Sequence, residues 1–295
     1  MKEENNEENV EKKEEEEKNE DKKSNKEEDN SNENKEVEQI NKIIDSNRKI
    51  TNEDLKEASI LILEGKECDI FNGEKIKINA FGMEGGKGRN DGVTIFGGNP
   101  DQDKDISNKY IDFVLNLKHK NNSPYIFYIF FEKDTKSYFI SPYSGNNKDN
   151  RILYAKLTNG YNLPLKQKEI ISAGNIFFQI TPLENNNLEI VNLSKQNLSL
   201  TPKQTFNASS KKEVTIGRNK NCDFSFHNNK SFSRIQTTFE FDEENQEWVM
   251  IDGSRTKSST NGTWVFCTHK YPIKDKMIVK VFDNYVQIHE EVQGE

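Results

Sequence analysis

Apolar and polar residues alternate with a period of two over most of the chain, from about residue 75 onward. The alternating runs are short, and clusters of Gly, Asn, Asp and Pro separate them, which is the pattern of strands joined by turns. In the first half we predict strands over residues 75–78, 93–96, 111–117, 125–131, 138–140 and 176–180. Many short strands at this spacing predict an all-β fold, either a sandwich or a barrel.

Helical spacing appears upstream of these strands, in four apolar residues: Val37, Ile40, Ile43 and Ile44. Thr51 is a residue type that caps helices, and a second short helix after it would carry Leu55, Ala58 and Leu61. The alternative is that residues 60–63, which read Ile-Leu-Ile-Leu, form a first buried strand. The sequence does not decide between these two interpretations.

The second half repeats the scheme of the first. Residues 165–180 align without gaps with residues 273–288, at an offset of 108, and five of the sixteen positions are identical. Upstream, residues 93–95 match residues 214–216 in the same order. We interpret this as an internal duplication of one β domain. The polar stretch at residues 184–187 is the predicted boundary, which gives domains at residues 46–184 and 185–295.

The charge of the chain is unevenly distributed. The formal net charge is −8, and residues 1–40 contain 17 acidic against 8 basic residues, so the remainder carries +1. A segment so rich in charge and so poor in apolar side chains does not bury enough surface to fold. We therefore predict that residues 1–45 form a disordered acidic tail, and that the folded part is electrically balanced.

Composition also excludes several classes of protein. The chain has no apolar run long enough to span a membrane, no apolar N-terminal stretch of the secretory type, and no basic stripe for nucleic acid. Cys68, Cys222 and Cys267 lack partners at metal-ligand spacing, and the four histidines are scattered. We therefore expect no metal, no cofactor, no small-molecule substrate and no catalysis, in a reducing cytoplasm or nucleus.

Three polar elements in the second half have the chemistry of a phosphate site. Gly217-Arg218 follows a predicted strand, Ser231-Phe232-Ser233-Arg234 opens another, and residues 259–263 read Ser-Thr-Asn-Gly-Thr. The Arg guanidinium is a planar fork of donors that matches phosphate oxygens. Ser adds a neutral donor, and the Asn amide can both donate to and accept from a peptide backbone.

In this order and spacing, the three elements resemble the forkhead-associated (FHA) domain, over roughly residues 186–295. The resemblance implies a β-sandwich whose end loops bind phosphothreonine peptides. By it, Arg218 and Ser233 would contact the phosphate and Arg234 would add a second basic contact. Thr260 and Asn261 would hold the phosphothreonine and the peptide backbone, and Ser231 would line the same pocket. Gly217 and Gly262 would allow tight turns.

Two features depart from the family pattern. Gln236 stands where the family has a framework histidine, although Gln can also donate and accept hydrogen bonds. The loop from Asp252 to Ser259 is longer than usual. Both features resemble a subgroup of FHA proteins from ciliates and other protists.

The first copy resembles the family more weakly, so we interpret it as a degenerate FHA-like domain. It has Phe96-Gly97-Gly98 where Gly-Arg is expected, which removes the main phosphate ligand. Ser107-Asn108 and residues 144–147 stand loosely in the positions of the other two elements. Residues 82–88 are rich in glycine, but Lys87 precedes Gly88 rather than Ser or Thr, so a strand turn is favoured over a phosphate-binding loop.

Together, these features predict a non-enzymatic adaptor that recognises phosphothreonine in a partner protein through its C-terminal FHA domain. The alternative is a phosphate-independent scaffold that docks by the shape of its two sandwiches, for example in a cytoskeletal, axonemal or ciliary assembly. Trp248 and Trp264 occur in alternating strands, so we predict that both belong to the core rather than to a binding surface.

Overall fold

The computed structural model describes residues 38, 41–42, 50–87, 90–98, 110–117, 125–143, 152–158, 160–174, 176–194, 203–268 and 270–292. Most of the predicted acidic tail, residues 1–45, lies outside this described part. Of its residues, Glu38, Asn41 and Lys42 are described, and all three are helical. Among the described residues, no helix has the length and apolar character needed to cross a membrane.

The predicted helix after Thr51 and the alternative strand both form, one after the other. α2 (Asn52–Glu57) begins at Thr51, whose hydroxyl accepts the Asp54 N–H while the Asp54 carboxylate accepts the Thr51 N–H at 2.7 Å. This reciprocal pair satisfies two backbone donors that a helix start leaves free. The helix stops at Glu57, and β1 (Ile60–Lys66) follows, with Leu61 and Leu63 fully buried.

Strands are the main regular structure of the rest of the described chain, so the fold is all-β as predicted. The strands of the first half are β2 (Ile76–Asn79), β3 (Gly82–Met83), β4 (Val93–Gly97), β5 (Phe113–Val114), β6 (Tyr125–Glu132), β7 (Ser137–Pro142), β8 (Leu153–Lys156), β9 (Leu163–Pro164), β10 (Glu169–Ala173) and β11 (Ile176–Leu183). The prediction over residues 111–117 is wrong in length, because only β5 pairs there and Ile111 and Leu115 belong to different apolar clusters.

The second half contributes β12 (Asn187–Asn192), β13 (Lys203–Asn207), β14 (Glu213–Gly217), β15 (Phe224–Ser225), β16 (Thr237–Asp242), β17 (Glu247–Asp252), β18 (Thr263–Phe266), β19 (Tyr271–Pro272), β20 (Met277–Val281) and β21 (Asn284–Glu291). Its pairing repeats that of the first half. β14 pairs with β15 in parallel and with β16 antiparallel, as β4 does with β5 and β6.

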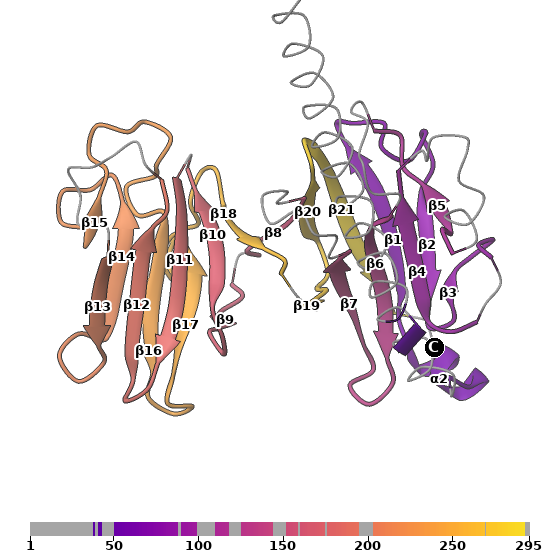
Figure 1. Cartoon of the computed structure of the whole chain (residues 1–295), viewed down its shortest axis with the longest axis horizontal. Coiled ribbons are helices and arrows are strands. Elements are labelled where there is room, and N and C mark those ends of the chain that lie inside the picture. Colours follow the sequence, from indigo (N-terminus) through magenta and orange to yellow (C-terminus); the bar gives the residue numbers. More distant parts are fainter. Residues whose placement is uncertain are drawn as a thin grey trace, which may run out of the picture.

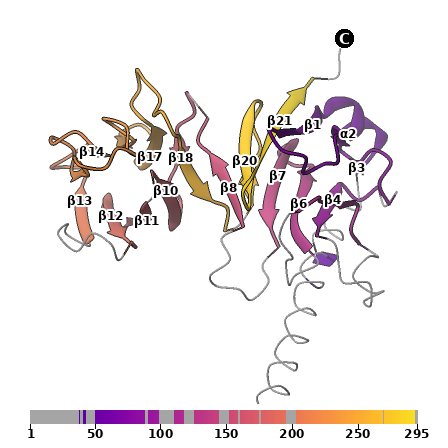
Figure 2. The ribbon, with the colours of Figure 1, turned by 90° about the horizontal axis from the view of Figure 1, so that it is seen from above.

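Three sheets build two sandwiches side by side (Figure 1). One sheet of eleven strands, ordered β13-β12-β11-β10-β18-β8-β20-β21-β1-β2-β3, extends through both. The five-stranded sheet β19-β7-β6-β4-β5 belongs to the first sandwich, and β15-β14-β16-β17-β9 belongs to the second. Figure 2 shows β18, β8 and β20 between the two groups of strands, where the long sheet passes from one sandwich to the other.

The two halves exchange their last strands. β1 pairs with β21 over seven residues, so the C-terminal hairpin β20–β21 completes the first sandwich. β12 pairs with β11, so the hairpin β10–β11 completes the second. In Figure 1 the yellow β20 and β21 therefore stand beside the indigo β1, while β10 and β11 lie among the orange strands.

The internal repeat explains how the two hairpins can change places and still pack against the core. The exchanged hairpins have equivalent bounds at the offset of 108, and each presents alternating buried residues, such as Ile171 and Phe178 in one and Val279 and Val286 in the other. The boundary predicted at residue 184 lies in the turn between β11 and β12. Because of the exchange, each sandwich contains strands from both sides of it.

Candidate functional site

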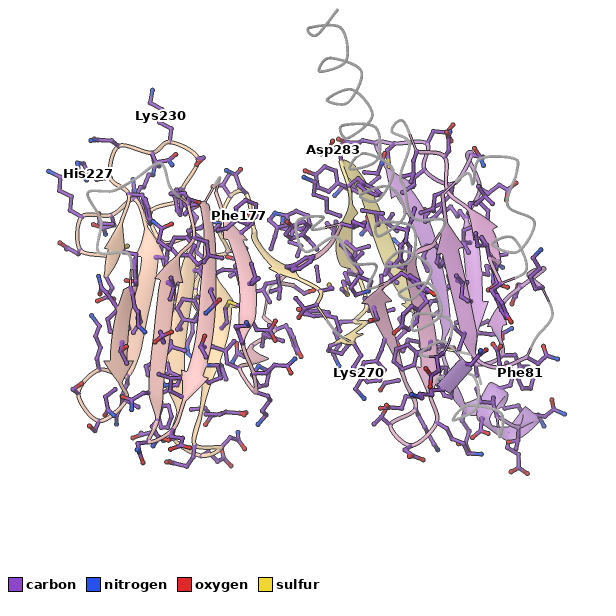
Figure 3. The ribbon with its side chains drawn as sticks, viewed as in Figure 1. Phe81, Phe177, His227, Lys230, Lys270 and Asp283 are labelled. Atoms are coloured by element: carbon purple, nitrogen blue, oxygen red, sulfur yellow. The ribbon has the colours of Figure 1, made fainter. Side chains whose placement is uncertain are left out.

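The predicted site residues of the second half gather at one end of the second sandwich. They come from three loops: residues 218–223 after β14, residues 226–236 between β15 and β16, and residues 253–262 between β17 and β18. Figure 3 shows Lys230, from the second of these loops, pointing away from the strands at this end. The fold therefore brings together three segments that are far apart in sequence.

Two hydrogen bonds connect the Ser231–Ser233 loop with the Thr260–Asn261 turn. The Thr260 N–H donates to the Ser233 hydroxyl at 2.8 Å, and the Asn261 side-chain amide donates to the Ser231 carbonyl at 2.8 Å. The Ser231 hydroxyl lies 2.6 Å from the Asn229 side-chain oxygen and donates to it. The Ser233 hydroxyl still has its own proton to donate, which suits it to an anion.

The buried side chain of Gln236 connects the Ser231–Ser233 loop with the Thr260–Asn261 turn. Its side chain is fully buried, its oxygen accepts the Ser233 N–H at 3.0 Å, and its amide donates to the Ser259 hydroxyl at 2.8 Å and to the Gly262 carbonyl at 2.9 Å. These three bonds use both protons and the oxygen of one side chain. The residue that replaces the family's histidine thus links both site loops.

Ser259 and Asp252 extend this buried network, and neither was singled out as a site residue from the sequence. The Ser259 hydroxyl donates to the Asp252 carboxylate at 2.6 Å and accepts the Gly262 N–H at 2.9 Å. The Asp252 carboxylate also accepts the Ser259 N–H at 3.2 Å. A carboxylate that accepts several donors is a rigid anchor, so the start of the Thr260–Asn261 turn is fixed from both sides.

Gly217 and Gly262 are positions where a side chain does not fit. A methyl group at Gly217 would overlap the Arg234 carbonyl, because β14 and the Arg234 backbone are in close contact there. A hydrogen bond beside this close contact joins the two segments, because the Arg218 N–H donates to the Ser233 carbonyl at 2.9 Å. Gly262 has a φ of +78°, which favours glycine, and a methyl group there would overlap the stem of Lys156.

Positive charge dominates the surface of this site. Arg218 and Arg234 are both exposed, as are Lys220 and Lys230 in the same loops. Within the described part of the chain, none of these four side chains forms an ion pair. Two carboxylates belong to these loops or border them: Asp252 is buried and held by Ser259, and Asp223 is paired with Lys211. The exposed side chains of the site loops therefore include four cations that are not neutralised by these carboxylates.

The long loop after Asp252 is an ordered turn. The Ser254 N–H donates to the Lys257 carbonyl at 2.9 Å, and the Gly253 N–H donates to the Gln236 carbonyl at 2.9 Å. Arg255 donates to the Glu240 carboxylate at 2.6 Å, which ties the loop to β16. The extra residues thus fold onto the sandwich and leave the Thr260–Asn261 turn open.

The exchanged hairpin also reaches the site. Gly174, in the turn between β10 and β11, has a φ of +60°, and a methyl group there would lie 2.9 Å from the Ser231 hydroxyl and 2.8 Å from the Phe232 ring. Phe178 of the same hairpin contacts Phe226 with ring centroids 5.8 Å apart. A segment of the first half thus supports the loop that carries Ser231 and Ser233, which the sequence alone does not indicate.

The two tryptophans differ in position. Trp248 is buried as predicted, and its indole N–H donates to the Asn186 carbonyl at 3.0 Å. The core prediction is wrong for Trp264, which is only half-buried on the outer face of the long sheet. Its indole N–H donates to the Asn261 carbonyl at 3.1 Å, so this ring borders the site.

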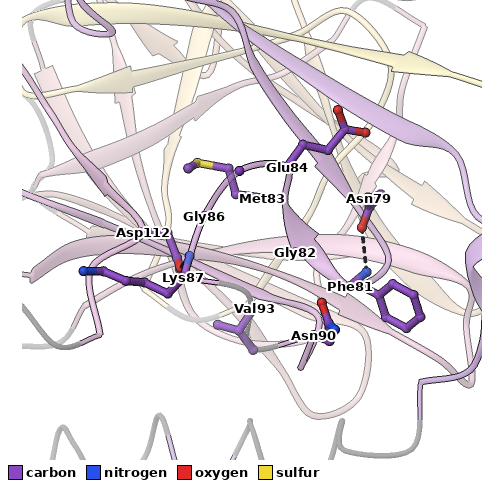
Figure 4. A pocket seen from close by; sticks show the side chains of 11 residues that line it. Asn79, Phe81, Gly82, Met83, Glu84, Gly86, Lys87, Asn90, Val93 and Asp112 are labelled. Carbon is purple, nitrogen blue, oxygen red and sulfur yellow. Dashed lines mark hydrogen bonds between the residues drawn. The ribbon is translucent and has the colours of Figure 1, made fainter.

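The first copy has no equivalent set of residues in the described part. The strand pairing makes Gly97 equivalent to Gly217 and Gly98 equivalent to Arg218, one residue away from the predicted match of residues 93–95 with residues 214–216. Ser107-Asn108 and residues 144–147 lie outside the described residues. A cavity of about 320 Å³ lies beside the glycine-rich turn, lined by Gly82–Lys87, Asn90 and Asp112 (Figure 4). The Asp112 carboxylate accepts the Lys87 and Ile95 N–H groups, which makes this turn part of the sheet connection rather than an anion cradle.

The described residues contain no cluster of His, Cys, Asp and Glu able to hold a metal ion. The family model of the FHA domain matches residues 214–282. The chain contains an FHA domain. No curated protein and no solved structure matches the chain.

The FHA match has a direct structural meaning. It begins in β14 and includes all three site loops, so Arg218, Ser233 and Asn261 lie inside it. It ends just after β20, which in the structure pairs with β8 and β21 in the first sandwich. The FHA domain is a phosphopeptide-binding module for protein interaction and not a catalytic fold. The match therefore supports a protein-interaction role for the segment that contains the three loops.

Proposed function

We propose that this FHA domain binds phosphothreonine in a partner protein, with Arg218 and Ser233 as the main phosphate ligands. The observation that carries the proposal is the pairing of these two residues. The Arg218 N–H is bonded to the Ser233 carbonyl, and the Ser233 hydroxyl accepts the Thr260 N–H. The guanidinium of Arg218 and the free proton of Ser233 thus start from one fixed point and can converge on one anion.

The other predicted site residues have supporting roles in the proposal. Arg234 adds a second exposed cation beside Ser233, and Asn261 lies at the open end of the turn. We propose that Thr260 and Asn261 hold the phosphothreonine and the peptide backbone. Ser231 lines the pocket from the side of the exchanged hairpin, and Gly217, Gln236 and Gly262 maintain the shape of the loops.

Charge-assisted hydrogen bonds contribute about 1.5–3 kcal/mol each, so losing the Arg218 side chain should weaken binding by about 10-fold to 150-fold. The test uses the full chain, because the second sandwich needs β10 and β11 from the first half. A phosphothreonine peptide library is captured by the parent, by Arg218→Ala and by Ser233→Ala, before and after phosphatase treatment. Phosphoserine versions of the retained peptides test the preference for threonine.

Lys212→Ala is the control, because Lys212 is an exposed cation just before β14, at the end of that strand away from the site, where it pairs with Glu243. The proposal requires that Lys212→Ala binds like the parent and that Arg218→Ala does not. Capture that survives both phosphatase and Arg218→Ala would instead favour a scaffold that docks by shape and ignores phosphate.

A further inference from the structure

A lysine of the first half lies against the Asn261 turn. Lys156 ends β8, which pairs with β18 so that Lys156 is directly opposite Trp264. The aliphatic stem of Lys156 packs on Gly262, where a methyl group would overlap its Cε atom. The glycine that ends the turn therefore leaves the space that this lysine occupies.

Aromatic rings continue the surface away from the turn. The Lys156 ammonium lies 5.9 Å from the centre of the Trp264 ring, and that ring lies 5.6 Å from Tyr285 of β21. The Lys280 ammonium lies 6.0 Å from the Tyr285 ring, and Tyr285 is 39 % exposed. We call these four residues, Lys156, Trp264, Lys280 and Tyr285, the lysine–aromatic patch.

The patch is continuous with the proposed peptide site. The Trp264 indole bonds to the carbonyl of Asn261, the residue proposed to hold the peptide backbone. Within the described part of the chain, Lys156 forms no ion pair and no hydrogen bond through its ammonium group. Lys280 has one acidic neighbour, Asp283, at 3.6 Å, and that carboxylate is 84 % exposed. An approaching chain therefore meets a free cation beside an aromatic face.

We propose that Lys156 is a specificity-determining residue that reads an acidic side chain flanking the phosphothreonine, on the Asn261 side of the site. This inference rests on the proposed function. The Lys156 ammonium lies beside a half-buried ring and is partly shielded from water, which strengthens an ion pair with a peptide carboxylate. The aliphatic part of the same acidic side chain of the peptide can pack on Trp264. The residue that sets the preference thus comes from the first half, although the phosphate ligands come from the second.

The test measures the affinity of the full chain for one phosphothreonine peptide, with a single glutamate placed at successive positions on either side. We expect one or two neighbouring positions, on one side only, to improve Kd by about two- to five-fold over alanine, as an exposed ion pair does. Lys156→Met keeps the stem and removes the charge, so it should abolish this gain while leaving the affinity for the alanine peptide unchanged. Lys156→Arg should restore the gain.

Lys168→Met is the control for loss of a surface charge, because Lys168 precedes β10 at the end opposite the Gly174 turn. It should retain the gain. A parent that binds the phosphothreonine peptide but gains nothing from glutamate at any position, or a gain that survives Lys156→Met, would overturn the inference and leave the proposed function intact. A parent that binds no phosphothreonine peptide would overturn both.

Discussion

The side-chain amide of Gln236 donates to the hydroxyl of Ser259 at 2.8 Å, and both groups are buried. The same hydroxyl accepts the Gly262 N–H and donates to Asp252, so its hydrogen-bonding capacity is fully used. This contact connects β16 to the turn that carries Thr260 and Asn261. The shape of the site therefore depends on a fully buried side chain.

Gln236→Ala should destabilise the protein and weaken peptide binding together. It removes three hydrogen bonds and leaves the half-buried Ser233 N–H and the buried Ser259 hydroxyl and Gly262 carbonyl without this partner. We expect the free energy of unfolding to fall by about 3 kcal/mol, because unpaired buried polar groups are costly. Denaturant titration followed by circular dichroism measures the loss.

Two comparison variants sharpen this prediction. Gln236→His should lose less, about 1 kcal/mol, because a neutral imidazole has one donor and one acceptor and can restore two of the three bonds. Gln204→Ala, in the edge strand β13, should be close to neutral, since Gln204 is half-buried and far from the network. Equal losses for Gln236→Ala and Gln204→Ala would mean that the network contributes nothing.

Gly217→Ala should open the gap between β14 and the Arg234 backbone. The new methyl group would overlap the Arg234 carbonyl, which belongs to the backbone and cannot rotate away. We expect a loss of about 1–3 kcal/mol in unfolding free energy and a displaced Arg218. Gly98→Ala, in the first copy, is the control, because the nearest atom to its methyl group would be the Ile126 Cδ1 at 3.5 Å. Thermal unfolding of the two variants should differ clearly.

The sequence predicts which loops lie together at the candidate site, but it does not predict the chain topology. Arg218, Ser233 and Asn261 can be placed together from sequence because each belongs to a motif with a fixed neighbour, such as Gly217 or Gly262. The spacing of residues within a motif depends on the conformation of one loop, and each of these loops has the expected neighbours in the structure. The same reasoning finds the β period and the helix cap at Thr51, because both depend on residues close in sequence.

What the sequence does not reveal depends on contacts between equivalent segments. β11 and β21 are similar enough in apolar pattern that either could pair with β1 or β12, and no local signal distinguishes the two arrangements. The positions of Lys156 and Trp264 follow from that choice, because both lie where the long sheet passes between the sandwiches. Trp264 looks like a core residue in an alternating strand, yet its side of the strand is the open one.

The strand exchange can be tested with paired cysteines. In the structure Gln179 of β11 is directly opposite Val191 of β12, and both are half-buried on the outer face. Opposed residues on antiparallel strands lie within disulfide range. We therefore expect Gln179→Cys with Val191→Cys to cross-link on mild oxidation, in a Cys68→Ser background that removes the half-exposed native thiol.

The matched control is Gln287→Cys with Val191→Cys. Gln287 is the equivalent of Gln179 at the offset of 108, and it would face Val191 only if each half kept its own last hairpin. Non-reducing peptide mapping should detect the link from residue 179 and not the link from residue 287. The reverse result would show that the halves fold without exchange.

Glu169 makes the second sandwich sensitive to pH. It lies at the start of the exchanged β10, it is 6 % exposed, and burial raises the pKa of its carboxyl from 4.5 to about 7. Because the folded state holds the proton more tightly than the unfolded state, this carboxyl favours folding below pH 4.5. That contribution is lost as the pH rises towards 7. The Glu169→Gln side chain is neutral at every pH. The free energy of unfolding of this variant should therefore rise relative to that of the parent by about 3 kcal/mol between pH 4.5 and pH 8.

Denaturant titrations at a series of pH values measure this difference. Glu244→Gln is the control, at an exposed position in the β16–β17 turn, and its free energy of unfolding should show no such rise relative to the parent. A parent and a Glu169→Gln variant whose stabilities change in parallel across this range would mean that the carboxyl is charged within the folded sandwich.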